Sequence, residues 1–232
     1  MITQLENDLF ERYKHNECYS TFVPDGVVSP DSWMQQNVKI IFLLKEVNSE
    51  YKSFDLRQFL YKGGKARTWN NIAIWTCGIL NDSDWNTAKN APFNRANWLH
   101  KIAVINVKKK GGTSNTDTRN LIKFFDANNC AELLSGQLDI LHDANYIICC
   151  GKGVYSCLLK ALKINPLLAK WHHIREQMNE DNLKILMPTD GCKSPYIIDF
   201  YHPQCRIKHE TLFSLLMKAV TCCKNNSNIQ LV

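Results

Sequence analysis

Three residues that could take part in chemistry each come at the end of an apolar run of the sequence. They are Glu46, Asn106 and His202. A carboxylate can accept a proton or stabilise a positive charge, and an imidazole can donate a hydrogen bond to a developing negative charge. A carboxamide offers a donor and an acceptor together, which suits recognition of a polar ring edge. These side chains would therefore suit a reaction in which charge separates across a breaking bond.

The apolar runs before these residues predict buried β-strands. Residues 38–44, 102–107, 146–150 and 196–200 are short and largely apolar, as is typical of strands covered on both faces. Residues 183–187 predict a further strand. Because parallel strands place their carboxyl ends at one edge of a sheet, the residues that follow these runs are expected to lie together.

Segments with helical periodicity alternate with the strands. The predicted helices cover residues 5–19, 56–61, 69–80, 116–128, 131–141, the segment from Gly153 to about Leu162, and 208–222. Residues 81–97 are rich in Asn, Asp and Ser and predict a long surface loop. This alternation predicts an α/β fold, specifically a three-layer α/β/α sandwich with a central, mostly parallel sheet.

The whole chain, residues 1–232, is expected to form one domain. Within it, residues 1–37 are expected to be an N-terminal helix and turn region, and residues 224–232 a flexible tail. Apolar residues make up 45% of the chain and charged residues 22%, which argues against disorder. No apolar run is long enough to span a membrane, and the first residues lack the pattern of a signal peptide. We therefore expect a cytoplasmic monomer, with no membrane association and no obligate protein partner.

The ten cysteines show no C-x-x-C spacing, so they are interpreted as reduced structural thiols. No metal or cofactor is expected. The net charge of +6 permits an anionic partner. Basic residues follow several predicted strands and could converge with the site; alternatively, they belong to a solvated surface. These basic residues are Lys108, Lys109, Lys110, Lys152, Arg206 and Lys208.

Short motifs at the predicted strand ends resemble those of the uracil-DNA glycosylase superfamily. Leu44-Lys45-Glu46-Val47-Asn48 stands where members carry their first motif, Ile105-Asn106-Val107-Lys108 where they carry the middle motif, and Tyr201-His202-Pro203-Gln204 where they carry a late His-Pro-Ser motif. Ile148-Cys149-Cys150-Gly151-Lys152 is similar to their strand-glycine-helix element. The order and spacing cover residues 38–222, although each motif is short and degenerate.

This resemblance implies a glycosylase-like fold and a role for each matching residue. Glu46 and His202 would be catalytic, with Glu46 in the place of the water-activating acid. Asn106 would read the pyrimidine edge, and Asn48, Phe54 and Phe59 would line the base pocket. The residues implied to bind DNA are Lys108, Gly151, Lys152, Gln204, Arg206 and Lys208.

Departures from the family pattern concern the turn and the pocket. The first motif lacks its Gly and Pro, and Gln204 replaces Ser. Asn48 stands where the uracil-specific branch has a Tyr that blocks substituents on C5 of the ring. The expected activity is therefore that of a monofunctional DNA glycosylase that flips out uracil or a 5-modified pyrimidine, such as a phage hydroxymethylcytosine derivative, and leaves an abasic site. Its setting would be base-excision repair or antiviral defence.

Each assignment has a simpler alternative. Glu46 could form a surface ion pair with a lysine, Asn106 could satisfy backbone groups at a strand end, and Phe54 and Phe59 could be packing residues. The chain as a whole could be a catalytically inactive DNA-binding module of the same fold. It could also be a doubly wound domain that acts on free nucleotides.

Overall fold

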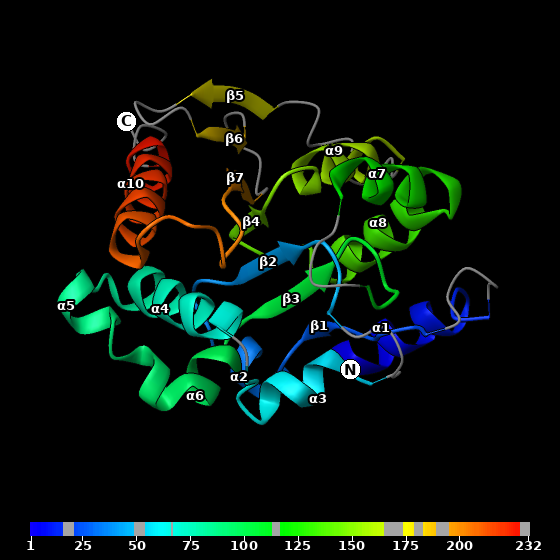
Figure 1. Cartoon of the computed structure of the whole chain (residues 1–232), viewed down its shortest axis with the longest axis horizontal. Coiled ribbons are helices and arrows are strands. Elements are labelled where there is room, and N and C mark those ends of the chain that lie inside the picture. Colours follow the sequence, from blue (N-terminus) through cyan, green and yellow to red (C-terminus); the bar gives the residue numbers. More distant parts are fainter. Residues whose placement is uncertain are drawn as a thin grey trace.

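The computed structural model describes most of the chain. The described residues are 1–15, 21–48, 54–65, 67–112, 117–164, 174–178, 183–188 and 195–227. Within these ranges the protein is a mixed α/β structure built around one sheet (Figure 1).

The sheet has seven strands among the described residues, in the order β1-β3-β2-β4-β7-β6-β5. The strands are β1 (Gly26–Val27), β2 (Ile40–Leu44), β3 (Ala103–Asn106), β4 (Tyr146–Cys150), β5 (Ile174–Met178), β6 (Lys184–Pro188) and β7 (Tyr196–Phe200). The neighbours β3, β2, β4 and β7 are mutually parallel. The predicted parallel centre of the sheet is thus confirmed, and the carboxyl ends of these four strands share one edge.

Both margins of the sheet are antiparallel. β1 pairs antiparallel with β3, β6 with β7, and β5 with β6. The sequence predicted neither β1 nor β5. The two-residue β1 is too short to show a pattern, and the sequence of β5, Ile-Arg-Glu-Gln-Met, carries the polar residues that suit a strand at the margin of a sheet.

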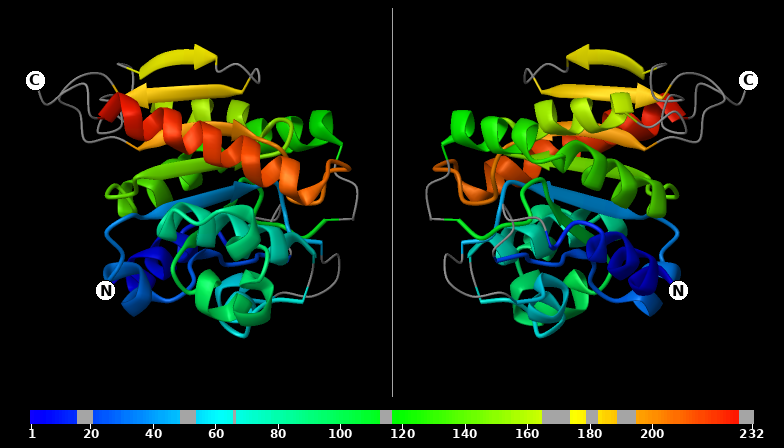
Figure 2. Two further views of the ribbon diagram at one scale, coloured as in Figure 1. Left: turned by 90° about the vertical axis from the view of Figure 1, so that its left-hand side faces the viewer. Right: turned by 90° about the vertical axis from the view of Figure 1, so that its right-hand side faces the viewer.

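Helices cover both faces of the sheet, as predicted (Figures 1 and 2). Along β2, Ile40, Phe42 and Leu44 belong to one hydrophobic cluster, whereas Ile41 and Leu43 belong to the other. On the first face lie α3 (Leu56–Tyr61), α4 (Arg67–Asn81), α5 (Trp85–Ala88), α6 (Arg95–Leu99) and α10 (His209–Ser227). On the second lie α1 (Ile2–Glu11), α2 (Pro30–Met34), α7 (Thr118–Ala127), α8 (Cys130–Ile140) and α9 (Val154–Ile164).

Three predicted boundaries are corrected. Residues 81–97 are not a long loop, because they form α5, the 3-10 helix η2 (Ala91–Asn94) and the start of α6. Asp84 caps α5 by accepting a hydrogen bond from the Thr87 amide at 2.9 Å, and such short capped helices need no apolar periodicity. α1 ends at Glu11, and residues 16–19 of its predicted span lie outside the described residues. α10 continues to Ser227, so the first part of the expected tail is helical.

A buried polar cluster holds β1 against β3 and the surrounding helices. The Asp25 carboxylate accepts hydrogen bonds from the Asn106 amide at 2.7 Å and from Lys109 Nζ at 2.6 Å. Gln137 of α8 also donates to it, at 3.2 Å. Lys109 is therefore an internal counter-ion rather than part of a basic surface.

Glu6 of α1 is fully buried beside this cluster and should make stability depend on pH. It accepts hydrogen bonds from the Val27 amide and from Arg57. Burial raises the pKa of Glu6 to about 7 from its usual 4.5, against the opposing effect of Arg57. Between these values the folded protein binds more protons than the unfolded chain, so stability is fully present below the lower value and is lost as the pH rises.

We therefore expect Glu6 to lower the free energy of unfolding by up to about 3 kcal/mol between acidic and mildly alkaline pH. Urea unfolding at pH 5 and pH 8 measures this loss. Glu6→Gln keeps the shape of the side chain but cannot ionise. Between pH 5 and pH 8 the variant should therefore lose less stability than the parent, by that amount. An equal loss in the variant and the parent would show that Glu6 is not responsible.

Candidate functional site at the carboxyl edge of the sheet

The predicted site residues meet at one edge because their strands are parallel neighbours. In the order of the sheet, Asn106 ends β3, Glu46 follows β2, Gly151 follows β4 and His202 follows β7. Strands far apart in sequence thus bring Asn106, Glu46 and His202 to one edge, with Gly151 between Glu46 and His202 in the order of the strands. This edge is the usual position of a ligand site in an open α/β sheet.

Gly151 forms the junction between two of these segments. Its amide donates to the Phe200 carbonyl oxygen at 2.8 Å, and its φ of +103° lies in a region that other residues rarely adopt. A Cβ atom placed on Gly151 would lie 3.3 Å from His202 Cβ and 3.6 Å from Lys45 Cε. The side chains of Lys45 and His202 therefore both lie against Gly151, where an added side chain would crowd them.

Gly151→Ala is expected to destabilise the protein by about 1–3 kcal/mol, because the added methyl group is both strained and close to two side chains. Urea unfolding measures the loss. Ser156→Ala, at an exposed position of α9, is the matched control and should unfold as the parent does. A Gly151→Ala variant as stable as the parent would contradict the proposed close contact.

His202 is half-buried, and its tautomer follows from its neighbours. The Gln204 amide donates to His202 Nδ1 at 3.2 Å, so this nitrogen carries no proton and Nε2–H is the ring donor. Burial lowers the pKa of His202 below its usual 6.5, and the nearby positive charge of Lys45 lowers it further. His202 is thus a neutral hydrogen-bond donor at pH 7.

The His-Pro loop is held from α4 by a residue that the sequence did not single out. Asn71, which is almost completely buried, donates through Nδ2 to the Pro203 carbonyl oxygen. Within the loop, the Cys205 amide donates to the His202 carbonyl oxygen at 2.9 Å. Asn71 gave no sequence signal because it lies inside an apolar helix, 132 residues away from its partner.

Lys45 is the second residue that sequence reasoning left without a role. Burial lowers the pKa of its amine; Glu46 and Asp117 raise it, and Lys152 lowers it. These groups surround Lys45 from β2, the start of α7 and the turn after β4. Lys45 thus lies among the charged groups of this edge.

Glu46 forms an ion pair with Lys108, as its alternative interpretation expected, but the pair is not on the surface. The Glu46 side chain is 4% exposed and that of Lys108 is 17% exposed. A Cβ atom placed on Gly112 would lie 2.2 Å from Glu46 Oε1, so the Gly112 backbone covers the carboxylate. Lys108 Nζ also lies 5.0 Å from the ring centre of Phe124. Lys108 therefore acts as a partner of Glu46 in this arrangement.

Asn106 is also directed inward. It is 2% exposed, and its Nδ2 donates to Asp25 at 3.2 Å. The structure thus places Asn106 at the expected strand end, with its amide group engaged by the buried polar cluster. A direct contact with a ligand would require this hydrogen bond to be exchanged.

The aromatic residues expected at the base pocket pack on the protein itself. Phe54 and Phe59 meet edge to face, with ring centres 5.9 Å apart, and both lie against the core of the first face. Asn48 is exposed and forms a β-bridge with Gly112. The structure therefore leaves Asn48 accessible and uses the two rings for packing.

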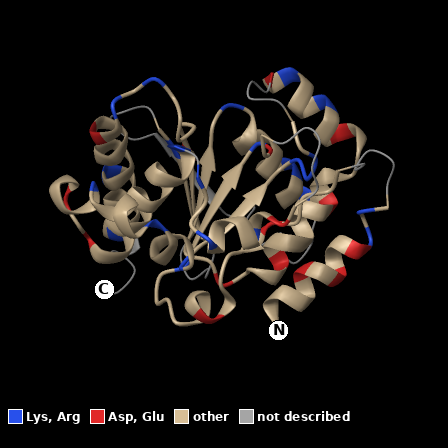
Figure 3. Cartoon of the chain, turned by 60° about the horizontal axis from the view of Figure 1, so that its bottom comes forward, with Lys and Arg blue, Asp and Glu red and all other residues tan. Residues whose placement is uncertain are grey.

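The remaining predicted DNA-binding side chains are accessible. Lys152, Gln204, Arg206 and Lys208 are exposed around the turn after β4 and the loop after β7. Figure 3 shows, however, that Lys and Arg are spread over several elements and do not gather at this edge alone. The basic character of the site thus rests on a few side chains.

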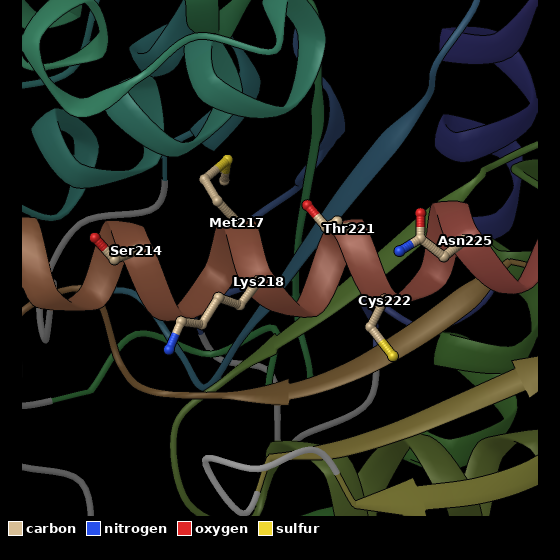
Figure 4. Close-up of a pocket in the computed structure, with 6 residues that line it drawn as sticks. All are labelled: Ser214, Met217, Lys218, Thr221, Cys222 and Asn225. Carbon is tan, nitrogen blue, oxygen red and sulfur yellow. The ribbon is translucent and has the colours of Figure 1, made fainter.

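A groove of about 550 Å³ lies elsewhere, along α10 (Figure 4). Its described lining consists of Ser214, Met217, Lys218, Thr221, Cys222 and Asn225. None of the predicted site residues lines it, so it is separate from the candidate site.

Among the described residues, no group of three or more His, Cys, Asp or Glu side chains could hold a metal ion. No described helix is both long and apolar enough to cross a membrane.

In comparisons with known proteins, no family model matches the sequence, and no curated protein matches it.

Proposed function

We propose that this protein is a DNA glycosylase of the uracil-DNA glycosylase type, which hydrolyses the N-glycosidic bond of a pyrimidine and leaves an abasic site. One observation carries the proposal. The segments that resemble the three family motifs, together with the Gly151-Lys152 turn, end four adjacent parallel strands at one edge.

The arrangement offers groups for both sides of the breaking bond. As the bond lengthens, positive charge develops on the sugar and negative charge on the departing base. His202 Nε2–H would donate to a carbonyl oxygen of the base, where the negative charge accumulates. Glu46 would stabilise the sugar cation or take a proton from the attacking water. Because Glu46 is covered in this structure, either role requires Lys108 or the Gly112 segment to move when DNA binds.

The exposed side chains around His202 suit the DNA backbone. Lys152, Arg206 and Lys208 would bind phosphates, and Gln204 would contact the strand beside the flipped nucleotide. Asn48 is small and accessible at the position where the uracil-specific branch places a blocking Tyr. This favours a 5-substituted pyrimidine, including a modified base of phage DNA, alongside uracil as a substrate.

A second candidate is a DNA-binding module of the same type without catalysis. The observation that favours it is the partly buried Glu46–Lys108 ion pair, because a carboxylate engaged in this way does not activate water. The two candidates make the same prediction for DNA binding and opposite predictions for base release.

The deciding experiment is single-turnover base release from oligonucleotides that contain uracil, 5-hydroxymethylcytosine or its glucosylated form. Alkali-labile strand breaks measure the product, and DNA binding is measured in parallel at several salt concentrations. Strand breaks at one of these bases, with binding that weakens steeply as salt rises, would support the glycosylase. Salt-dependent binding without breaks at any of the three would favour the binding module.

A further inference from the structure

The amine of Lys45 lies at the same edge of the sheet as the groups proposed to act on the sugar and on the leaving base. It follows β2 directly and lies next to Glu46, the proposed sugar-side residue. Its Cε and His202 Cβ both lie within 4 Å of the Cβ position at Gly151. Lys45 is therefore close to the proposed leaving-base group as well.

We infer that Lys45 is a nucleophile that forms a Schiff base with the abasic sugar, which gives the protein a lyase activity toward abasic DNA. This inference rests on the proposed function for its choice of substrate. Its geometric basis is the juxtaposition of Lys45, Gly151 and His202 at the carboxyl edge of β2, β4 and β7.

The surroundings of Lys45 favour the unprotonated amine that such a reaction needs. Burial lowers its pKa, with Glu46 and Asp117 opposing this effect and Lys152 adding to it. Lysines that form Schiff bases in proteins are activated in this manner, by desolvation and by a neighbouring cation. The Glu46 carboxylate, in contrast, is paired with Lys108 and covered by the Gly112 backbone, with its side chain 4% exposed.

Cleavage of the abasic strand through a Schiff base requires no cofactor. The Lys45 amine adds to the C1′ aldehyde of the ring-opened abasic sugar, and the carbinolamine takes up one proton from solvent and loses one water to form a protonated imine. A base takes a proton from C2′, the electron pair moves toward the imine, and the C3′–O bond breaks so that the phosphate leaves with the bonding electrons. Solvent water accepts that proton, because Nδ1 of His202 is engaged by the Gln204 amide and Nε2 already carries a proton. Water then hydrolyses the unsaturated imine and returns the free amine.

Borohydride trapping tests the inference directly, because it reduces the imine to a stable secondary amine. The probe is an oligonucleotide with one abasic site that is generated before the protein is added, so the assay does not depend on base release. The parent protein should give a covalent protein–DNA adduct, and peptide mapping should place the adduct on Lys45.

Two variants at Lys45 distinguish the nucleophilic role of its amine from the effect of its positive charge. Lys45→Arg keeps the positive charge and should bind abasic DNA but give no adduct; Lys45→Met should also give none. Lys160→Met is the matched control, because Lys160 of α9 is an accessible lysine paired with Asp126 away from the site. It should give as much adduct as the parent. Urea unfolding of each variant establishes that it is folded.

The outcomes distinguish this inference from the proposed function. Absence of an adduct with the parent protein, or an undiminished adduct with Lys45→Arg, would overturn the role of Lys45. If base release still occurred in that case, the proposed function would stand as a monofunctional activity. An adduct on Lys45 with no base release from the three modified oligonucleotides would instead support the lyase and count against the proposed glycosylase.

Discussion

Replacing His202 with alanine is expected to slow single-turnover base release by about 10²–10³-fold while DNA binding is retained. The reason is that Nε2–H is the ring donor, held in that tautomer by the Gln204 amide at Nδ1. Removing the imidazole removes a hydrogen bond that strengthens as charge develops on the leaving base. Rapid-quench measurement of base release, with binding followed by fluorescence anisotropy, gives the two quantities separately.

The same histidine predicts an acid limb in the rate. The pKa of His202 is lowered from 6.5 by burial and by Lys45. Below that lowered pKa, a second ring proton at Nδ1 would face the Gln204 N–H group and disrupt the loop. Titration of His202 is therefore expected to leave the rate of base release unchanged at pH 7 and above, and to lower it only at a pH below 6.5.

His142→Ala is the matched control, because this exposed histidine at the end of α8 contacts only the local backbone in the contacts described for it. Its rate and pH profile should equal those of the parent. If His202→Ala released base as fast as the parent does, the proposed hydrogen bond to the leaving base would be wrong.

The central strands could be predicted from sequence because they are buried on both faces. Each of β2, β3 and β4 is buried along its whole length, so nearly all of its residues are apolar; the exception, Asn106 at the end of β3, is hydrogen-bonded to Asp25. Even Cys149 and Cys150 of β4 fit this pattern, since burial raises the pKa of both thiols and keeps them protonated. The polar residues after these strands then predicted the common edge.

The direction of each side chain at that edge could not be predicted, because it depends on distant partners. Lys108 and Lys109 are adjacent in sequence, yet Lys108 pairs with Glu46 and Lys109 with Asp25. Asp25 lies in a turn-rich segment whose contact with β3 depends on the two-residue strand β1. A run of three lysines thus looked like a basic surface, although two of its members neutralise buried carboxylates.

The roles of Lys45 and Asn71 in the candidate site also could not be predicted, because they depend on contacts between distant segments. Lys45 precedes the acid that the motif comparison selected, and its proximity to His202 exists only because β4 lies between β2 and β7. Asn71 supports the His-Pro loop from an apolar helix on the first face. Residue type and motif spacing indicated which segments meet, whereas the contacts between them follow from the order of the strands.

Glu46→Gln separates the two proposed functions and should have the largest effect on catalysis. If Glu46 acts on the sugar or on the attacking water, base release should fall by about 10²–10⁴-fold with DNA binding retained. Glutamine keeps the shape of the side chain under Gly112 and can still accept a hydrogen bond from Lys108, so the site itself should persist. Single-turnover release and anisotropy on the same preparation measure both properties.

The ion pair with Lys108 requires that stability be measured alongside rate. Removing the charge of Glu46 leaves the partly buried Lys108 without its anion, which should cost about 1–3 kcal/mol in urea unfolding. The double variant Glu46→Gln with Lys108→Met removes both charges, so it should recover much of that stability without recovering the rate. Glu132→Gln, at an exposed position of α8, should alter neither quantity.

Measuring both the stability and the base-release rate of these variants separates a catalytic role of Glu46 from a structural one. A slow but stable double variant would mean that the carboxylate itself is needed, and that the Glu46–Lys108 pair opens when DNA binds. If Glu46→Gln released base at the parental rate, Glu46 would be a structural counter-ion of Lys108. Any catalysis at this edge would then depend on Lys45 and His202, whose side chains both lie against Gly151.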